Sequence, residues 1–173
     1  MPHRLLRNST VKVAELIQRS VTELVGMRKS VLSVEMILAV LIEQKDSIFL
    51  KICDELRLDT DKIRTNLIQT LLDSVNKLEN FTNQTPTANI KISKEVQILF
   101  ESSDNERSRL EDTYISTNAL LLAFFNEELI NCKKLLEEAG LTYEKTFQAI
   151  KNIVGNRKIS EKDSESKAGV LHA

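Results

Sequence analysis

The sequence has few residues that break helices, because it holds only 4 glycines and 2 prolines among 173 residues. At the average frequencies of about 7% Gly and 5% Pro, a chain of this length would carry roughly three times as many. Folds built from many short strands need a turn every few residues. The composition therefore disfavours a many-stranded sandwich or barrel and favours a helical protein.

The residues of the common catalytic sites are also scarce. The two histidines, His3 and His172, each lie beside an end of the sequence, so no Ser-His-Asp arrangement can be written in the body of the chain. Cys53 and Cys132 are separated by 79 residues without a CxxC spacing, and we interpret them as buried, reduced thiols. The glycines are isolated from one another, so the sequence contains no glycine-rich phosphate-binding motif. We expect no catalytic residue, no metal site and no cofactor in this chain, and a hydrolase built on paired carboxylates has no motif behind it.

Charge and hydrophobicity exclude two classes of partner. Lys and Arg number 24 against 25 Asp and Glu, a formal charge of −1, whereas nucleic-acid-binding proteins show a basic excess. The longest apolar run, residues 119–125, is far shorter than the ~20 residues that span a bilayer. We expect no nucleic-acid partner and no membrane partner. The hydrophobic share of 42% is enough for a folded core.

An internal duplication organises the chain. When the sequence is shifted against itself by 83 positions, Thr10 meets Ser93, Ile37-Leu38 meets Leu120-Leu121 and Leu58 meets Leu141, with no gap between. This period is longer than the ~20–50 residues of solenoid repeats. The pattern predicts an all-α fold in which two tandem four-helix repeats, eight helices with pseudo-twofold symmetry, form one compact domain.

The spacing of apolar residues places the helices of each repeat. The first repeat has predicted helices at residues 11–25, 34–43, 47–56 and 60–77, and the second at 94–107, 117–126, 130–139 and 143–153. The second helix of each repeat is apolar on nearly all sides, so we expect it to be buried. Side chains that cap helix starts match between the repeats: Thr10 and Ser93, Ser33 and Ser116, Asp59 and Thr142. Gly26 is the predicted C-terminal cap of the first helix.

The predicted organisation has five parts. They are an N-terminal tail at residues 1–9, the first repeat at 10–77, a polar inter-repeat loop at 78–92, the second repeat at 93–155 and a charged flexible linker at 156–173. A domain followed by a linker suggests the front end of something longer. The acids Glu101, Asp104, Glu106, Glu111 and Asp112 are interpreted as a solvated face that could attract basic clients.

Two segments carry a resemblance to a known family. Residues 32–41 (LSVEMILAVL) and 112–122 (DTYISTNALLL) resemble the Clp N-terminal repeat domain, which precedes the ATPase rings of Clp and heat-shock unfoldases. The resemblance covers about residues 8–155. Residues 155–171 resemble the linker into the first ATPase module of ClpB, the disaggregase branch, so the predicted linker at 156–173 is expected to lead toward an ATPase module absent from this chain.

The resemblance implies a binding module rather than an enzyme. A ClpB-type N-terminal domain is expected to capture exposed apolar segments of unfolded or aggregated polypeptides and hand them to the ATPase ring. The resemblance implies a cytoplasmic parent protein that binds ATP and Mg, forms a homohexamer and cooperates with a DnaK-type chaperone system. The alternative is an adaptor-docking or substrate-docking domain of a protease-coupled ClpC- or ClpA-type unfoldase.

Four candidate substrate-binding residues come from the resemblance. Thr10 matches a threonine, and Asp112 the first of two acids, with which ClpB domains engage substrate. The second acid falls on Asn118, so that contact is expected to be weakened or reorganised. Glu35 matches the first of two glutamates that bind phosphorylated arginine in ClpC, and the second glutamate is missing here. Each residue also has a structural interpretation, since Thr10 can cap a helix and Glu35 favours a helix N-terminus.

Overall fold

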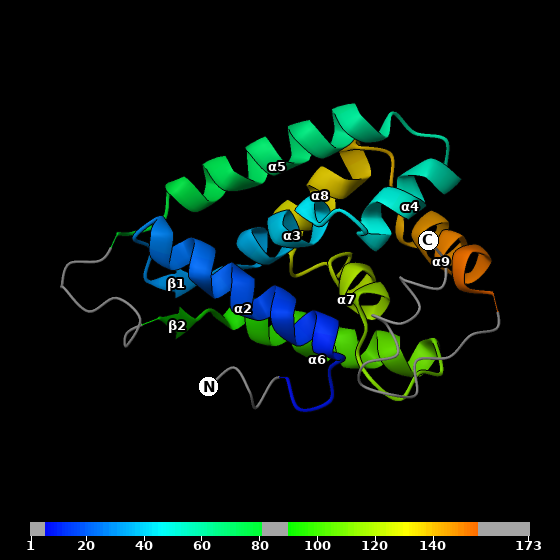
Figure 1. The fold of residues 1–173 in the computed structure, drawn as a ribbon, viewed down its shortest axis with the longest axis horizontal. Helices are drawn as coiled ribbons and strands as arrows, with labels where there is room; N and C mark the ends of the chain where they lie inside the picture. Colours follow the sequence, from blue (N-terminus) through cyan, green and yellow to red (C-terminus); the bar gives the residue numbers. More distant parts are fainter. Residues whose placement is uncertain (1–5, 81–89, 156–173) are drawn as a thin grey trace.

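A computed structural model describes residues 6–80 and 90–155 of the chain, and these form an almost entirely helical domain (Figure 1). The first repeat contains α2 (Val11–Gly26), β1 (Val31–Leu32), α3 (Val34–Glu43), α4 (Ile48–Glu55) and α5 (Thr60–Asn76). The second contains β2 (Lys91–Ile92), α6 (Lys94–Arg109), α7 (Thr117–Ala123), α8 (Ile130–Glu138) and α9 (Tyr143–Val154). The all-α fold with four helices per repeat is confirmed. Most of the predicted tail, the centre of the predicted loop and the predicted linker, at residues 1–5, 81–89 and 156–173, lie outside the described residues.

The helices begin where side-chain caps are available. In six of them the cap oxygen accepts a hydrogen bond from the backbone N–H three residues on, at 3.2–3.4 Å. The six caps are the three predicted pairs: Thr10 and Ser93, Ser33 and Ser116, Asp59 and Thr142. Each such bond satisfies an N–H that has no partner within its helix, at about 1 kcal/mol. The repeats differ at their third helices, because Ser47 caps α4 whereas Leu129 before α8 makes no side-chain cap bond.

Equivalent helices of the two repeats also end with the same backbone conformation. Four helices end on a residue in the left-handed conformation, with φ of 59° to 105° at Arg28, Arg57, Glu111 and Gly140. In each case the following N–H donates to a carbonyl five residues earlier, as Lys29 N does to Leu24 O at 3.0 Å. The 83-residue shift superimposes Arg28 on Glu111 and Arg57 on Gly140. The two repeats therefore share their helix stops as well as their starts.

The prediction that Gly26 caps α2 is wrong. Helix α2 continues through Gly26 to the C-cap residue Met27, and Arg28 takes the left-handed position at φ 61°. An arginine therefore adopts a backbone conformation that glycine adopts with less strain.

The two repeats are joined by a reciprocal exchange of short parallel pairings. In one, β1 of the first repeat pairs with β2, which precedes the second repeat, with Leu32 opposite Ile92. In the other, Ser9, which precedes the first repeat, pairs with Ile115 of the second. The 83-residue shift converts each pairing into the other. Residues 91–92, expected in the inter-repeat loop, are thus part of the pseudo-twofold joint (Figure 1).

Helices α3 and α7 form the centre of a single hydrophobic core. Each lies on the first helix of its own repeat and also contacts the first helix of the other, so α2 touches α7 and α6 touches α3. Ile37 and Leu38 on α3 and Leu120 and Leu121 on α7 have no exposed surface. Burial of each such side chain contributes about 1.5–3 kcal/mol relative to exposure. The two repeats therefore stabilise one shared core. No helix in the described residues is both long and apolar enough to cross a bilayer.

A buried lysine ties the end of the first repeat to its beginning. The Lys29 side chain is 4% exposed, and its ammonium donates to Asn76 O and Leu78 O, each at 2.9 Å, and to Asn80 Oδ1 at 2.7 Å. All three protons of Nζ are satisfied, as a buried ammonium requires. The contact holds the C-terminal end of α5 against the turn that follows α2. Nothing in the sequence pattern predicts this lysine to be buried.

Candidate functional site

Three of the four predicted binding residues lie on the two segments that meet at the Ser9–Ile115 pairing. Thr10 is completely buried, and its Oγ1 accepts a hydrogen bond from Val13 N at 3.2 Å. Its backbone N–H donates to Ile115 O at 2.9 Å. Thr10 therefore caps α2 and fixes the joint between the repeats. A client contact at Thr10 remains a prediction.

Asp112 and Asn118 flank Ile115 on the opposing segment. Asp112 follows α6 and is 7% exposed, and its carbonyl accepts a hydrogen bond from Arg107 Nη1 at 2.9 Å. Asn118 lies in the first turn of α7 and is also 7% exposed. Both residues thus lie near the joint in sequence, with only a small part of each at the surface. Asp112 was expected on a solvated face, and its burial corrects that expectation.

Glu35 lies at the equivalent place in the other repeat, since the 83-residue shift superimposes it on Asn118. Its Oε2 accepts a hydrogen bond from Asn131 Nδ2 of α8 at 3.1 Å. Glu95 at the start of α6 lies close enough that burial and the charge of Glu35 together raise the Glu95 pKa. Burial, with the same two carboxylates, raises the pKa of the Cys132 thiol well above its usual value. Glu35 therefore belongs to a separate acidic pair and not to the Thr10 joint.

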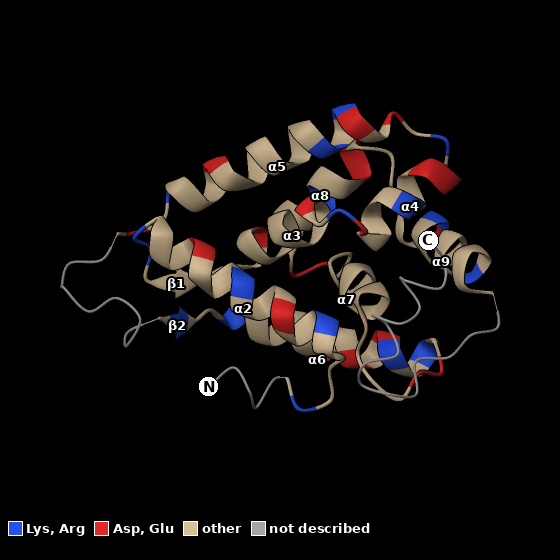
Figure 2. Ribbon diagram, in the orientation of Figure 1, with Lys and Arg blue, Asp and Glu red and all other residues tan. Residues whose placement is uncertain are grey.

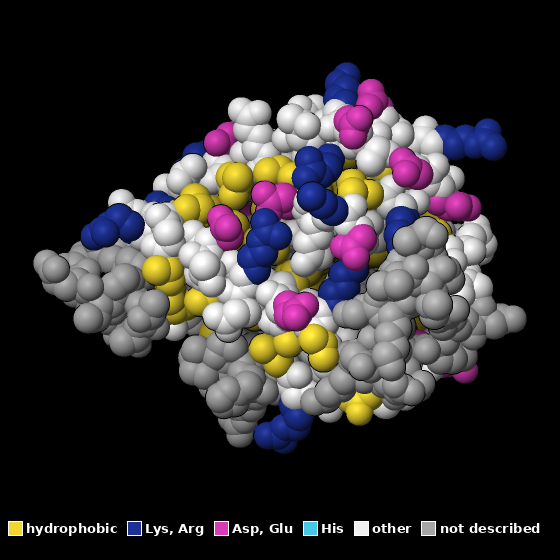
Figure 3. Space-filling model, in the orientation of Figure 1, with side chains coloured by type: hydrophobic (Ala, Val, Ile, Leu, Met, Phe, Trp, Pro, Cys, Tyr) yellow, Lys and Arg dark blue, Asp and Glu magenta, His cyan; other side chains and the backbone are white. Residues whose placement is uncertain are grey.

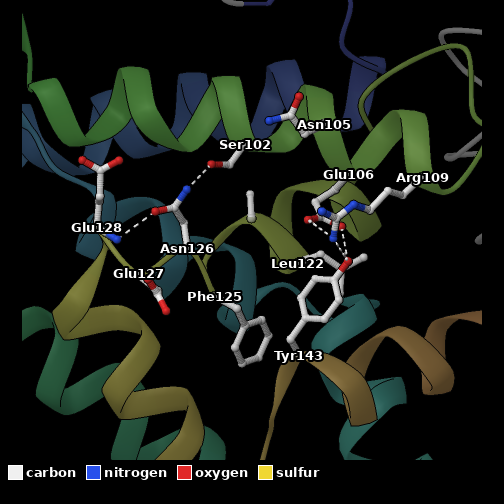
Figure 4. Close-up of a pocket in the computed structure, with 11 residues that line it drawn as sticks. Ser102, Asn105, Glu106, Arg109, Leu122, Phe125, Asn126, Glu127, Glu128 and Tyr143 are labelled. Atoms are coloured by element: carbon white, nitrogen blue, oxygen red, sulfur yellow. Dashed lines mark hydrogen bonds and ion pairs between the residues drawn. The ribbon is translucent and has the colours of Figure 1, made fainter.

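A pocket of about 590 Å³ opens between α6 and the turn that joins α7 to α8 (Figure 4). One wall is aromatic: the Phe125 and Tyr143 rings meet edge to face with centroids 6.3 Å apart, and Phe147 stacks behind Tyr143 at 6.0 Å. Three carboxylates line the pocket, from Glu106, Glu127 and Glu128, against one arginine. The pocket is therefore aromatic and net acidic.

One end of this pocket is a linked trio of side chains, from Glu106, Arg109 and Tyr143 (Figure 4). Tyr143 donates from its hydroxyl to Glu106 Oε1 at 2.6 Å and accepts a hydrogen bond from Arg109 Nη1 at 2.9 Å. Arg109 Nη1 also lies 3.6 Å from Glu106 Oε2, and its guanidinium carbon lies 5.8 Å from the Tyr143 ring centroid. Burial and the bond to Glu106 raise the Tyr143 pKa, so the phenol stays a donor.

This trio was not predicted from the sequence. Glu106 was expected on a solvated acidic face, whereas it is only 8% exposed. The signal was present in the spacing, because Glu106 continues the buried row of Val96, Leu99 and Ser103 along α6. A carboxylate on the buried side of a helix requires a polar partner. Tyr143 supplies that partner from another helix, which a reading of α6 alone does not reveal.

The opposite end of the pocket is polar and lies at the turn between α7 and α8. Asn126 donates from Nδ2 to Ser102 Oγ at 2.5 Å, and its Oδ1 accepts from Glu128 N at 2.8 Å (Figure 4). The 83-residue shift superimposes Ser102 on Arg19 and Asn126 on Glu43, and these two residues of the first repeat form an ion pair. The two repeats thus close the same helix contact with different chemistry.

Apolar side chains also reach the surface near these sites. Val11, next to Thr10, is 40% exposed, and Ile130, which begins α8 beyond the acidic turn, is 70% exposed. Figure 3 shows further apolar surface in a band between α5 and α2, interrupted by charged side chains. Figure 2 shows α5 without charges through its middle, in agreement with the uncharged residues 65–72. The described surface therefore mixes apolar patches with acids and bases.

Comparisons with known proteins agree on one family. The sequence model of the family described as the Clp repeat (R) N-terminal domain matches residues 8–139. The chain is 25% identical over 162 residues to the protein named Chaperone protein ClpB 1 of Nostoc sp., covering 94% of this chain and 18% of that protein. It is 31% identical over 111 residues to Chaperone protein ClpB of Lactococcus lactis subsp. cremoris, covering 64% of this chain and 12% of that protein. The chain thus spans less than a fifth of these relatives.

Solved structures give the same fold. The crystal structure of the Hsp104 N-terminal domain from Candida albicans superimposes with a TM-score of 0.70 at 16% identity, covering 91% of this chain and 99% of that one. The N-terminal domain of the caseinolytic protease associated chaperone ClpD from Arabidopsis thaliana superimposes with a TM-score of 0.57 at 16% identity, covering 86% and 99%. With the duplicated helices, the reciprocal pairings and the family match, the chain belongs to the Clp repeat N-terminal domain family.

Proposed function

We propose that this chain is the substrate-binding N-terminal domain of a ClpB-type disaggregase. It captures exposed apolar segments of unfolded or aggregated polypeptides and passes them to an ATPase ring. The similarity over 94% of the chain to a protein named ClpB carries the proposal. Exposed Val11 beside the joint of Thr10, Asp112 and Asn118 supports it, because an apolar anchor next to polar groups suits weak, reversible capture.

The remaining features of the parent protein belong to the same proposal. The relatives extend well beyond the length of this chain, which leaves room for the ATPase modules that would bind ATP and Mg. The parent protein is proposed to be a homohexamer in the cytoplasm that cooperates with a DnaK-type chaperone system. In this arrangement the domain itself performs no chemistry, and its affinity for clients sets how often the ring is supplied.

The test is binding of a permanently unfolded polypeptide to the 173-residue chain, measured by fluorescence anisotropy without nucleotide. Replacing both Thr10 and Asp112 by alanine is expected to weaken binding several-fold. The matched control is Ser93→Ala with Asp73→Ala, because Ser93 is the equivalent cap of the other repeat and Asp73 is an exposed acid on α5. Undiminished binding by the Thr10 and Asp112 variant, or equal loss in the control, would refute the site. No binding by the unaltered chain would refute the function.

An adaptor-docking or substrate-docking domain of a ClpC- or ClpA-type unfoldase is the second candidate. The observation that favours it is Glu35, which is retained beside Glu95 and held by Asn131. Chimeras distinguish the two candidates: the domain is fused to a ClpB ring or to a ClpC ring from which the native N-terminal domain has been removed. The disaggregase proposal expects restored reactivation of aggregates with the ClpB ring. Restored peptidase-dependent degradation with the ClpC ring alone would favour the second candidate.

A further inference from the structure

The pocket between α6 and the α7–α8 turn has the features of a cation site. Its aromatic wall and its three carboxylates favour a positive group, since aromatic faces and carboxylates both attract cations. The Glu106 side chain is 11% exposed, and a carboxylate this deeply buried requires a polar or charged partner. Its Oε1 accepts a short bond from Tyr143, whereas its Oε2 has an ion pair at 3.6 Å and no hydrogen bond within the described residues. One oxygen of Glu106, Oε2, therefore has an ion-pair partner but no hydrogen-bond donor in the described residues.

The present occupant of this position is a guanidinium of the same chain. Arg109 lies over the Tyr143 ring and donates to the Tyr143 hydroxyl, so the geometry already accommodates an arginine. The Arg109 side chain is nevertheless 62% exposed. Its Nη1 lies 3.6 Å from Glu106 Oε2, so the guanidinium does not form a bidentate pair with the carboxylate. An exposed, singly bonded arginine is a weak occupant that another guanidinium can displace.

We infer that the Glu106–Tyr143 pocket binds arginine side chains of client polypeptides, and that Arg109 occupies the site in the free domain. An incoming arginine displaces Arg109, pairs with Glu106 and stacks on the Tyr143 ring, while Glu127 and Glu128 attract neighbouring positive charge. Arginine is favoured over lysine because its planar fork can both stack and pair. This inference rests on the proposed function, because it specifies which client segments the domain selects.

The first repeat provides an internal contrast. The 83-residue shift superimposes Glu106 on Glu23, Arg109 on Gly26 and Tyr143 on Thr60, so the first repeat has the acid without the aromatic ring or the occupant. Glu23 is moreover exposed on α2. The arginine preference should therefore depend on the second repeat alone, and Glu23→Gln is a control that makes the same charge change at the equivalent helix position.

The experiment measures binding of three fluorescent peptides to the 173-residue chain. They are an apolar peptide with one central arginine, its twin with citrulline, which is neutral and of the same shape, and its twin with lysine. The arginine peptide is expected to bind about tenfold more tightly than the citrulline twin, the factor typical of a charge-assisted hydrogen bond. Glu106→Gln and Tyr143→Phe should each reduce this preference, and Glu23→Gln should leave it unchanged. Thermal melts establish that each variant is folded, and Tyr143→Phe removes only a hydroxyl.

Arg109→Ala gives the decisive result. Removal of the internal occupant is expected to tighten binding of the arginine peptide about two- to fivefold, while the citrulline twin is unaffected. Weaker or unchanged binding of the arginine peptide to Arg109→Ala would overturn the inference, as would equal binding of arginine and lysine peptides. If arginine and citrulline peptides bind equally well, the inference fails and the proposed client-binding function stands. If no peptide binds, both fail.

Discussion

Replacement of Lys29 by methionine is expected to destabilise the chain by about 2–4 kcal/mol. The variant keeps the apolar stem in place and removes three hydrogen bonds from a side chain that is 4% exposed. A hydrogen bond to a charged group contributes about 1.5–3 kcal/mol. The total is below the sum of three because Asn80 is an exposed residue, and its side-chain amide can turn to water once the ammonium is removed. The loss should release the end of α5 from the turn after α2.

Urea unfolding followed by circular dichroism measures this change as a lower midpoint with an unaltered slope. The matched control is Lys77→Met, which removes the same charge from an exposed position one residue beyond α5. The control is expected to cost less than about 0.5 kcal/mol, as is usual for surface substitutions. Equal stability of the Lys29 and Lys77 variants would refute the reasoning, because it would mean that the buried ammonium gains nothing from its three acceptors.

Three further predictions concern two helix ends, a buried thiol and a pair of glutamates. Arg57→Gly should stabilise the chain by about 0.5–1 kcal/mol and Gly140→Ala should destabilise it by about 1 kcal/mol, because both positions are left-handed; thermal melts with shifts of the same sign would contradict this. Burial raises the pKa of Cys53 to about 12, so the folded chain holds this proton at pH values where the unfolded chain releases it. Stability should therefore fall as pH rises above about 9, a decline that Cys53→Ala should reduce in urea titrations at several pH values. Glu35→Gln should lower the Glu95 pKa, measured by carboxyl NMR titration, and an unchanged pKa would show that the two side chains do not interact.

The helices were predictable because their signals are local. Periodic apolar residues and side-chain caps lie within a few residues of the helix they define, and the bounds of α3 agree with the predicted residues 34–43. The duplication added a second, independent observation of each signal. Helix ends without glycine were harder to predict, as the end of α2 illustrates, because Arg28 takes a left-handed conformation that its own propensity disfavours.

The joint and the pocket depend on contacts between distant segments, and the sequence carries no local signal for them. The Ser9–Ile115 and Leu32–Ile92 pairings unite residues far apart in the chain through backbone bonds, which leave no pattern in side-chain type. The environment of Glu106 is set by Tyr143 on another helix, so its burial could be suspected from spacing but its partner could not be identified. Burial of Thr10 likewise depends on the joint, and it shows why a residue that caps a helix can also lie at a candidate binding site.

Binding of unfolded polypeptides at defined places on this chain can be followed residue by residue in an NMR titration. Backbone amide shifts of the 173-residue chain are followed as a permanently unfolded polypeptide is added without nucleotide. We expect saturable shifts concentrated at residues 8–12 and 112–118 and around the Glu106–Tyr143 pocket, while the exposed residues of α5 stay unaffected. An unchanged spectrum at saturating polypeptide, or shifts that avoid all three places, would contradict it.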